Sequence, residues 1–208
     1  MEIKKLELGG GAVNCYIVSD GADAVVIDPG FEAELVAEYL EKNGLHLHYI
    51  FLTHGHYDHI LAVPALKEMT GAQLVISEQD ADYLVNPERS LAKFVRMQQQ
   101  PCTADILAHE GSIFNVGGME FRWMITPGHT KGSSVIACGR SLFTGDTLFR
   151  DTCGRCDFPG GSYDEMLQSL KRIAEFEGDY DVYAGHMEDT TLSRERRYNM
   201  HVKEAMGI

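Results

Sequence analysis

The chain has 208 residues, a length that fits one domain with its own hydrophobic core. Its formal net charge of -13 repels the phosphate groups of nucleic acids and of anionic membranes, so neither is expected as a partner. Five cysteines are an odd number for a disulfide framework, and no apolar run approaches the ~18 residues of a membrane span, so we expect a cytoplasmic protein without a signal peptide.

The first half of the chain predicts strands interrupted by helices. Strands are expected where β-rich stretches are bounded by glycine or Asp-Pro-Gly turns, and helices where apolar residues recur at helical spacing. The expected strands are residues 3–8, 13–18, 24–27, 49–52 and 73–76, and the expected helices are residues 32–42, 61–69 and 77–97. Ser77 and Asp80 have the spacing of a capping box at the start of the third helix. Residues 101–110 are expected to form a connector.

The second half begins with strands again and ends in helices. The expected strands are residues 112–116, 120–126, 133–138, 142–143 and 181–184. Ser162 and Glu165 form a capping box that opens a helix to about Phe176, and a C-terminal helix is expected from about residue 190. Because the order of strands followed by a helix occurs twice, we predict an α+β chain that forms one domain over residues 1–208, a four-layer αββα sandwich.

Histidine and aspartate side chains follow four of the expected strands. Four of them lie in the run His-Gly-His-Tyr-Asp-His at residues 54–59, and the others each come after a later strand, beside a glycine. These residues are His54, His56, Asp58, His59, His129, Asp146 and His186. Imidazole nitrogens and carboxylate oxygens bind cations such as zinc, and buried groups of this kind otherwise need partners. A surface loop that is merely rich in histidine does not explain the three later positions, so the pattern predicts a metal site.

The order of these motifs resembles the metallo-β-lactamase superfamily, and most of all its glyoxalase II-like (hydroxyacylglutathione hydrolase-like) group. Segments 13–16, 27–30 and 148–161 also match that group, so the resemblance runs from about residue 10 to residue 200. It implies two divalent metal ions per chain, zinc in first place, with iron and manganese as alternatives.

The resemblance also implies how the ligands divide between the two metals. It assigns His54, His56 and His129 to the first metal, Asp58, His59 and His186 to the second, and Asp146 to a bridging position. Asp28 has no place among the ligands. Its implied role is to orient the site through hydrogen bonds, and a role in its own turn is the alternative.

A glyoxalase II-like enzyme hydrolyses a thioester, so the resemblance implies S-acylglutathione, such as S-lactoylglutathione, as the small-molecule substrate. A metal-bridging hydroxide held by Asp146 and oriented by Asp58 would attack the carbonyl. Arg155 and Asp157 stand where the family has a lysine and a tyrosine that contact glutathione. Arg155 can still bind a carboxylate, whereas Asp157 would repel one. Few residues follow His186, so the chain resembles a short form without the family's C-terminal helical domain.

Other functions remain as alternatives. A mononuclear-iron persulfide dioxygenase shares the His-x-His-x-Asp-His signature and uses one metal, and a hydrolase of another small ester or lactone is a second alternative. A flavodiiron reductase is disfavoured because His56 stands where that group has a glutamate, and a β-lactamase is disfavoured without an export signal. The protein is expected to be a monomer or a homodimer.

Two further patterns have both a chemical and a plain interpretation. Cys153 and Cys156 have the CxxC spacing of zinc and redox sites, but one such pair is a weak signal, and incidental small residues are preferred. Arg194, Arg196 and Arg197 could hold a small anion, although a solvated helical face is preferred.

Overall fold

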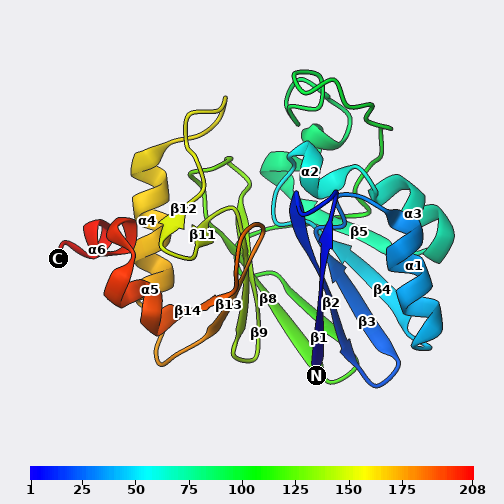
Figure 1. Ribbon diagram of the computed structural model, residues 1–208, viewed down its shortest axis with the longest axis horizontal. Coiled ribbons are helices and arrows are strands. Elements are labelled where there is room, and N and C mark those ends of the chain that lie inside the picture. The colour runs from blue at the N-terminus through cyan, green and yellow to red at the C-terminus, as the bar shows by residue number, and fades with distance from the viewer.

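Two six-stranded sheets pack face to face, and helices cover the outer face of each, as Figure 1 shows. The computed structural model describes all 208 residues. The strand order is β1-β2-β3-β4-β5-β6 in the first sheet and β14-β13-β10-β9-β8-β7 in the second. The predicted four-layer αββα sandwich is therefore confirmed. None of the helices has the length and apolar character that a membrane crossing requires.

The first sheet changes from antiparallel to parallel pairing across its width. Its strands are β1 (Glu2–Leu8), β2 (Val13–Asp20), β3 (Asp23–Ile27), β4 (His46–Phe51), β5 (Gln73–Ser77) and β6 (Ile106–Ala108). The first three strands pair antiparallel, and β3 to β6 pair parallel. The chain crosses between the parallel strands through α1 (Ala33–Lys42), α2 (Tyr57–Ile60) and α3 (Val63–Thr70). Because the carboxyl ends of parallel strands meet at one edge of a sheet, the loops after β3 and β4 lie side by side.

The second sheet is mostly antiparallel. Its strands are β7 (Ile113–Val116), β8 (Met119–Ile125), β9 (Ser134–Cys138), β10 (Ser141–Gly145), β13 (Asp181–Ala184) and β14 (Thr190–Thr191). Only β10 and β13 pair parallel, so the loops that follow them leave at the same end. A separate ribbon of β11 (Leu148–Phe149) and β12 (Thr152–Cys153) was not predicted, nor was β14, because two residues are too few to show a period.

The helices α4 (Tyr163–Ala174), α5 (Leu192–Tyr198) and α6 (Met200–Met206) cover the second sheet. The predicted start of α4 is confirmed, since the Ser162 hydroxyl accepts a hydrogen bond from the Glu165 N–H at 3.3 Å. Met166, Leu170 and Ile173 recur at helical spacing and are fully buried. Each such side chain stabilises the fold by about 1.5–3 kcal/mol.

The space between the sheets is filled by aromatic rings. Phe51 on β4 lies 5.3 Å from Phe121 and 5.5 Å from Trp123, between ring centroids, and both partners belong to β8. Its neighbour Ile50 points the other way, into the core under α1 and α3. Strand β4 is thus buried on both faces, which explains why its sequence does not alternate.

The helix predicted over residues 77–97 is wrong in most of its length. A 3₁₀ helix, Glu78–Leu84, is followed by turns in which Leu91 and Arg96 have φ angles of +69° and +59°. Pro87 disfavours a helical conformation at Asn86, and the Asn86 side chain accepts hydrogen bonds from the next two N–H groups instead. The predicted connector over residues 101–110 contains β6, whose parallel pairing with β5 its sequence did not indicate.

Two of the three arginines of the basic run near the C-terminus are engaged by the protein itself, and the exposed Arg197 forms no ion pair. Arg194 forms ion pairs with Asp151 and Glu195. The Arg196 guanidinium donates to the carbonyl of Ala174, where α4 ends, and to that of nearby Gly178. Both arginines thus already bind internal acceptors, which leaves neither guanidinium free for a small anion.

Candidate metal centre

All seven predicted ligand residues come together at one edge of the sandwich, near α2 in Figure 1. They are carried by loops that follow β4, β8, β10 and β13, in the order His54, His56, Asp58, His59, His129, Asp146 and His186. Five of them are buried, whereas Asp58 and His186 are partly accessible. The short α2 begins directly after His56 and carries Asp58 and His59.

Three imidazoles form the first group of candidate ligands. His56 Nδ1 lies 3.1 Å from His54 Nε2 and 2.8 Å from His129 Nε2. His129 Nδ1 lies 2.7 Å from the carbonyl oxygen of Arg155, which can only accept, so this nitrogen carries the proton and Nε2 carries a lone pair. Neutral His56 can direct a proton from Nδ1 to only one of these two neighbours at a time, so at least one pair of nitrogens faces each other without a shared proton unless a cation lies among them.

The second group consists of an aspartate and two histidines. His59 Nε2 lies 3.3 Å from His186 Nε2, and His186 Nε2 lies 3.5 Å from Asp58 Oδ2. The Asp146 carboxylate reaches both groups. Its Oδ1 is 3.4 Å from His59 Nε2, and its Oδ2 is 3.4 Å from His129 Nε2.

The chemistry of these atoms fits a pair of divalent cations. Asp146 Oδ1 is buried and has no hydrogen-bond partner, so the protein itself leaves it unsatisfied. Burial lowers the pKa of His54, and burial together with neighbouring His129 lowers that of His56 to about 3. Both rings are therefore neutral, the form that binds a metal. The donors thus match a site for borderline metals built from nitrogen and carboxylate oxygen.

Asp28 lies directly behind His59. Its Oδ2 is 3.0 Å from His59 Nδ1 and accepts a hydrogen bond from the Thr53 hydroxyl at 2.7 Å. Its Oδ1 accepts from the Thr53 N–H at 2.8 Å. The carboxylate thus holds the His59 ring with Nε2 toward the centre, which agrees with the orienting role implied by the sequence.

Asp80 is a residue of the site that the sequence did not reveal. It is fully buried, and it accepts hydrogen bonds from the Gly55 N–H at 3.0 Å, the Thr130 hydroxyl at 2.7 Å and the Gly132 N–H at 2.8 Å. It does not cap the helix with Ser77, as its spacing predicted. Instead it ties the loop of residues 54–59 to the loop that follows His129. Only its three partners, distant in sequence, reveal this role.

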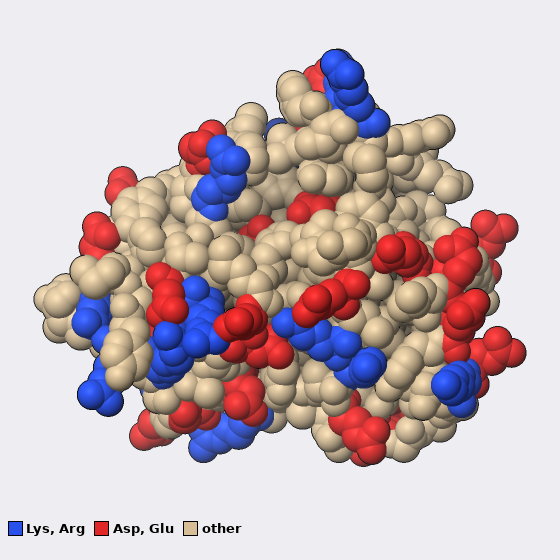
Figure 2. Space-filling model, in the orientation of Figure 1, with Lys and Arg blue, Asp and Glu red and all other residues tan.

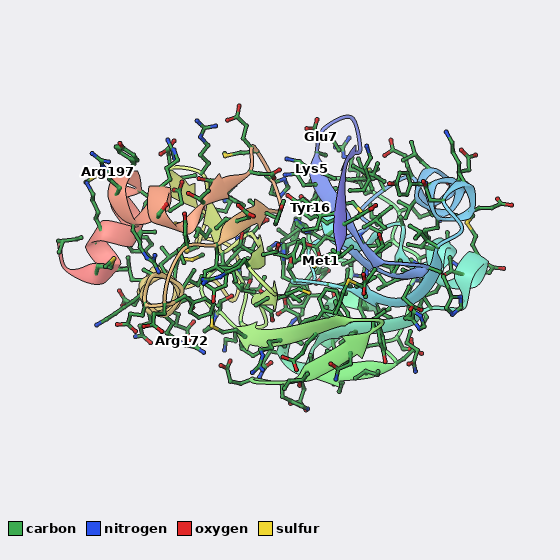
Figure 3. All side chains as sticks on the ribbon, turned by 90° about the horizontal axis from the view of Figure 1, so that it is seen from below. Met1, Lys5, Glu7, Tyr16, Arg172 and Arg197 are labelled. Atoms are coloured by element: carbon green, nitrogen blue, oxygen red, sulfur yellow. The ribbon has the colours of Figure 1, made fainter.

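The loop that carries His186 is held by the first two strands. Tyr16 donates a hydrogen bond to the Ala184 carbonyl at 2.7 Å, and Lys5 donates to the Met187 carbonyl at 3.1 Å. Lys5 and Tyr16 lie where the two halves of the molecule meet, as Figure 3 shows. His186 therefore takes its place only when β1 and β2 pack beside the second sheet.

A pocket of about 640 Å³ opens above the candidate ligands. Figure 2 shows a hollow on this side of the molecule, with acidic atoms inside it and mostly uncharged atoms around it. A recess of about 730 Å³ lies elsewhere, beside Met1 and Trp123, but no group of metal-binding side chains lines it. The chemistry of the molecule is therefore concentrated in the smaller pocket.

Arg155 lines this pocket, but its charge is already paired. Its guanidinium donates two hydrogen bonds of 2.7 Å to the Asp157 carboxylate and lies 4.0 Å from the ring centroid of Phe158. Asp157 thus binds Arg155 directly. Cys153 and Cys156 are free thiols, they belong to none of the candidate metal groups, and burial raises the pKa of Cys153 to about 12.

Comparisons with known proteins agree with this geometry. The family described as the metallo-beta-lactamase superfamily matches residues 8–186. The hydroxyacylglutathione hydrolase GloC of Haemophilus influenzae is 33% identical over 195 residues, which cover 89% of this chain and 91% of GloC. Among solved structures, the BLEG-1 B3 metallo-beta-lactamase is 29% identical with a TM-score of 0.91, over 97% of this chain and 99% of its own. ETHE1 from Myxococcus xanthus is 31% identical with a TM-score of 0.83, over 98% and 85%.

Proposed function

Since the chain belongs to the metallo-β-lactamase superfamily and is a metal-dependent hydrolase of that family, we propose that it cleaves thioesters. The reference substrate is an S-acylglutathione such as S-lactoylglutathione. The observation that carries the proposal is the position of Asp146, whose carboxylate lies within 3.4 Å of His129 from the first group of ligands and of His59 and His186 from the second. Such an arrangement suits two metals that share one nucleophile. The similarity to GloC supports the choice of thioester.

The residues of the candidate centre can be assigned to two metal ions and to the steps of thioester hydrolysis. When bound, two divalent ions, zinc in first place, would lower the pKa of a shared water and polarise the substrate carbonyl. The first ion would be held by His54, His56 and His129, the second by Asp58, His59 and His186, and Asp146 would contact both. The water oxygen adds to the carbonyl carbon, the C–S bond breaks, and the products are a carboxylate and a thiol. Because a thiol has a pKa of about 8.5, it leaves as a thiolate without a dedicated acid.

A persulfide dioxygenase is the alternative from another reaction class. It needs one iron, held by two histidines and an aspartate, with open positions for oxygen. Here the partly accessible Asp58 and His186 join His59 in a second group of donors, which a mononuclear enzyme does not require. Because the dioxygenase shares the His-x-His-x-Asp-His signature, Asp58 and His59 do not separate the two reactions, whereas the number of bound metal ions does.

Metal analysis combined with substrate assays tests the proposal. We expect two metal ions per chain, hydrolysis of S-lactoylglutathione, and no oxygen uptake with glutathione persulfide. A β-lactam such as nitrocefin is a useful control, because BLEG-1 carries the name of a β-lactamase. One iron per chain with oxygen uptake and no hydrolysis would replace the proposal by the dioxygenase.

A further inference from the structure

The pocket above the candidate metal centre has apolar walls on both sides. One wall belongs to the turns that follow Pro87, and the other to segments near β11 and to the loop after β13. The apolar lining residues are Leu91, Phe94, Val95, Phe149, Phe158 and Met187. Phe94 is 70% exposed and Met187 is 60% exposed. A single exposed apolar side chain is ordinary, but a set of them around a functional pocket indicates the surface of a ligand.

The charges around the pocket do not suit an anionic ligand. Arg155 is the only lysine or arginine among the lining residues, and Asp157 binds it through two hydrogen bonds. Asp58 and Asp146 also line this pocket, but both are candidate metal ligands whose charge bound cations would neutralise, so the relevant charges are those of the wall outside the metal centre. Lys131 belongs to a neighbouring recess that borders Phe94. Glutathione carries two carboxylates and one ammonium group. Its carboxylates would need cationic side chains, and no unpaired lysine or arginine lines this pocket.

We infer that the preferred substrate is a thioester with an uncharged apolar acyl chain, in which the glutathione body contributes little to recognition. The inference rests on the proposed thioester hydrolysis and names the substrate class of that site. A pocket of about 640 Å³ has the size of sites for small organic ligands. Removal of apolar surface from water then provides the binding energy, and it does so in proportion to chain length.

A matched series of thioesters tests this preference. Acetyl, butyryl, hexanoyl and octanoyl groups are attached to glutathione and, in parallel, to the uncharged thiol N-acetylcysteamine. We expect kcat/KM to rise about fourfold per added methylene until the pocket is filled. At equal chain length we expect glutathione to give no more than a twofold advantage. A flat series, or a tenfold advantage for S-lactoylglutathione over S-hexanoyl-N-acetylcysteamine, overturns the inference.

Two variants test whether the apolar wall that contains Phe94 causes the preference for longer acyl chains. Phe94→Ala removes an exposed ring, so the fold tolerates it, and we expect the ratio of kcat/KM for hexanoyl and acetyl thioesters to fall several-fold. Leu35→Ala is the matched control, since Leu35 is an exposed apolar residue on α1 outside the pocket. It should leave the ratio unchanged. An unchanged ratio in Phe94→Ala contradicts the assignment of this wall.

Binding of inert analogues separates this inference from the proposed function. The thioethers S-ethyl- and S-hexyl-N-acetylcysteamine cannot be hydrolysed, and their affinity for the metal-loaded protein is measured by calorimetry. We expect tighter binding of the hexyl compound, with a negative heat-capacity change. If this result appears while no thioester is hydrolysed, the proposed function fails and the apolar pocket stands. If thioesters are hydrolysed but neither rate nor affinity depends on chain length, the proposed function stands and the inferred preference for apolar acyl chains fails.

Discussion

Asp28 and His59 show how one carboxylate can orient a candidate metal ligand. The pair is fully buried, and the orientation of the ring follows from the 3.0 Å contact between His59 Nδ1 and Asp28 Oδ2. The sequence placed Asp28 in a turn near the ligands and left two roles open. Its φ angle of +54° shows that it also forms that turn, so both roles are realised in one residue.

The Asp28→Asn variant tests the orienting role. The amide no longer offers two anionic oxygens to Thr53 and His59, so the ring loses its fixed orientation. We expect metal affinity, measured by competition with a chelator, to fall by about 10- to 100-fold. Asp23→Asn is the control at the start of β3, the strand that Asp28 follows, because Asp23 pairs with the half-exposed His48 away from the centre. Equal metal affinities of the two variants would contradict the role of Asp28 in orienting His59.

Asp157 binds the guanidinium of Arg155, the residue that the sequence suggested for substrate binding. Hydrogen bonds from Arg155 lower the pKa of Asp157 to about 2, so the ion pair is intact at neutral pH. In Asp157→Asn the guanidinium is released, and we expect the ratio of kcat/KM for glutathione thioesters to that for uncharged thioesters to rise about threefold. The control is Asp181→Asn, which changes the net charge equally at an exposed residue of β13. A ratio that rises equally in both variants would indicate long-range charge alone.

At the scale of the elements, Asp80 fixes the position of the loop after β4 relative to the loop after β8. This carboxylate joins the N–H of Gly55 to the N–H of Gly132, and thereby the first histidine loop to the loop after β8. Gly132 has no room for a side chain, because a Cβ there would lie 2.6 Å from Asp80. The connection is therefore specified by packing as well as by hydrogen bonds.

The Asp80→Asn variant tests this connection. An amide NH₂ faces one of the donors, so a buried N–H loses its acceptor, at a cost of about 2–3 kcal/mol in the free energy of unfolding. Denaturant unfolding measures the loss, and hydrogen exchange at Gly55 and Gly132 should become faster. Asp82→Asn, at an exposed residue that pairs with Arg89, should change stability by less than about 0.5 kcal/mol. Unchanged exchange at both glycines would refute the role of Asp80.

Strands and helices with a clear period could be predicted from the sequence, and those shaped by distant contacts could not. Helix α4 shows both a cap and an apolar stripe, so its start and length were predictable. Residues 77–97 contain helix-forming side chains, but Pro87 and the bonds of Asp80 impose another path. Local propensity is overridden where tertiary hydrogen bonds compete with it.

For the molecule as a whole, the candidate centre is assembled from both halves. That the seven candidate ligand residues meet at one edge could be predicted, because each comes shortly after a strand. Their division into two groups came only from resemblance, since spacing cannot give the distances between loops of different sheets. Asn14 of β2, which donates to the carbonyls of Ala184 and Met187, had no sequence signal for this role. The site therefore depends on the packing of the halves as much as on its ligands.

Stepwise metal loading tests the central claim, that two metals sharing Asp146 perform hydrolysis. The protein is stripped with a chelator, zinc is returned in measured equivalents, and S-hexanoyl-N-acetylcysteamine and S-lactoylglutathione hydrolysis are followed together with bound metal. We expect the melting temperature to rise as metal binds the folded state, and full activity to need the second equivalent. Full hydrolysis with one ion per chain, or two bound ions without hydrolysis of either thioester, would contradict the account.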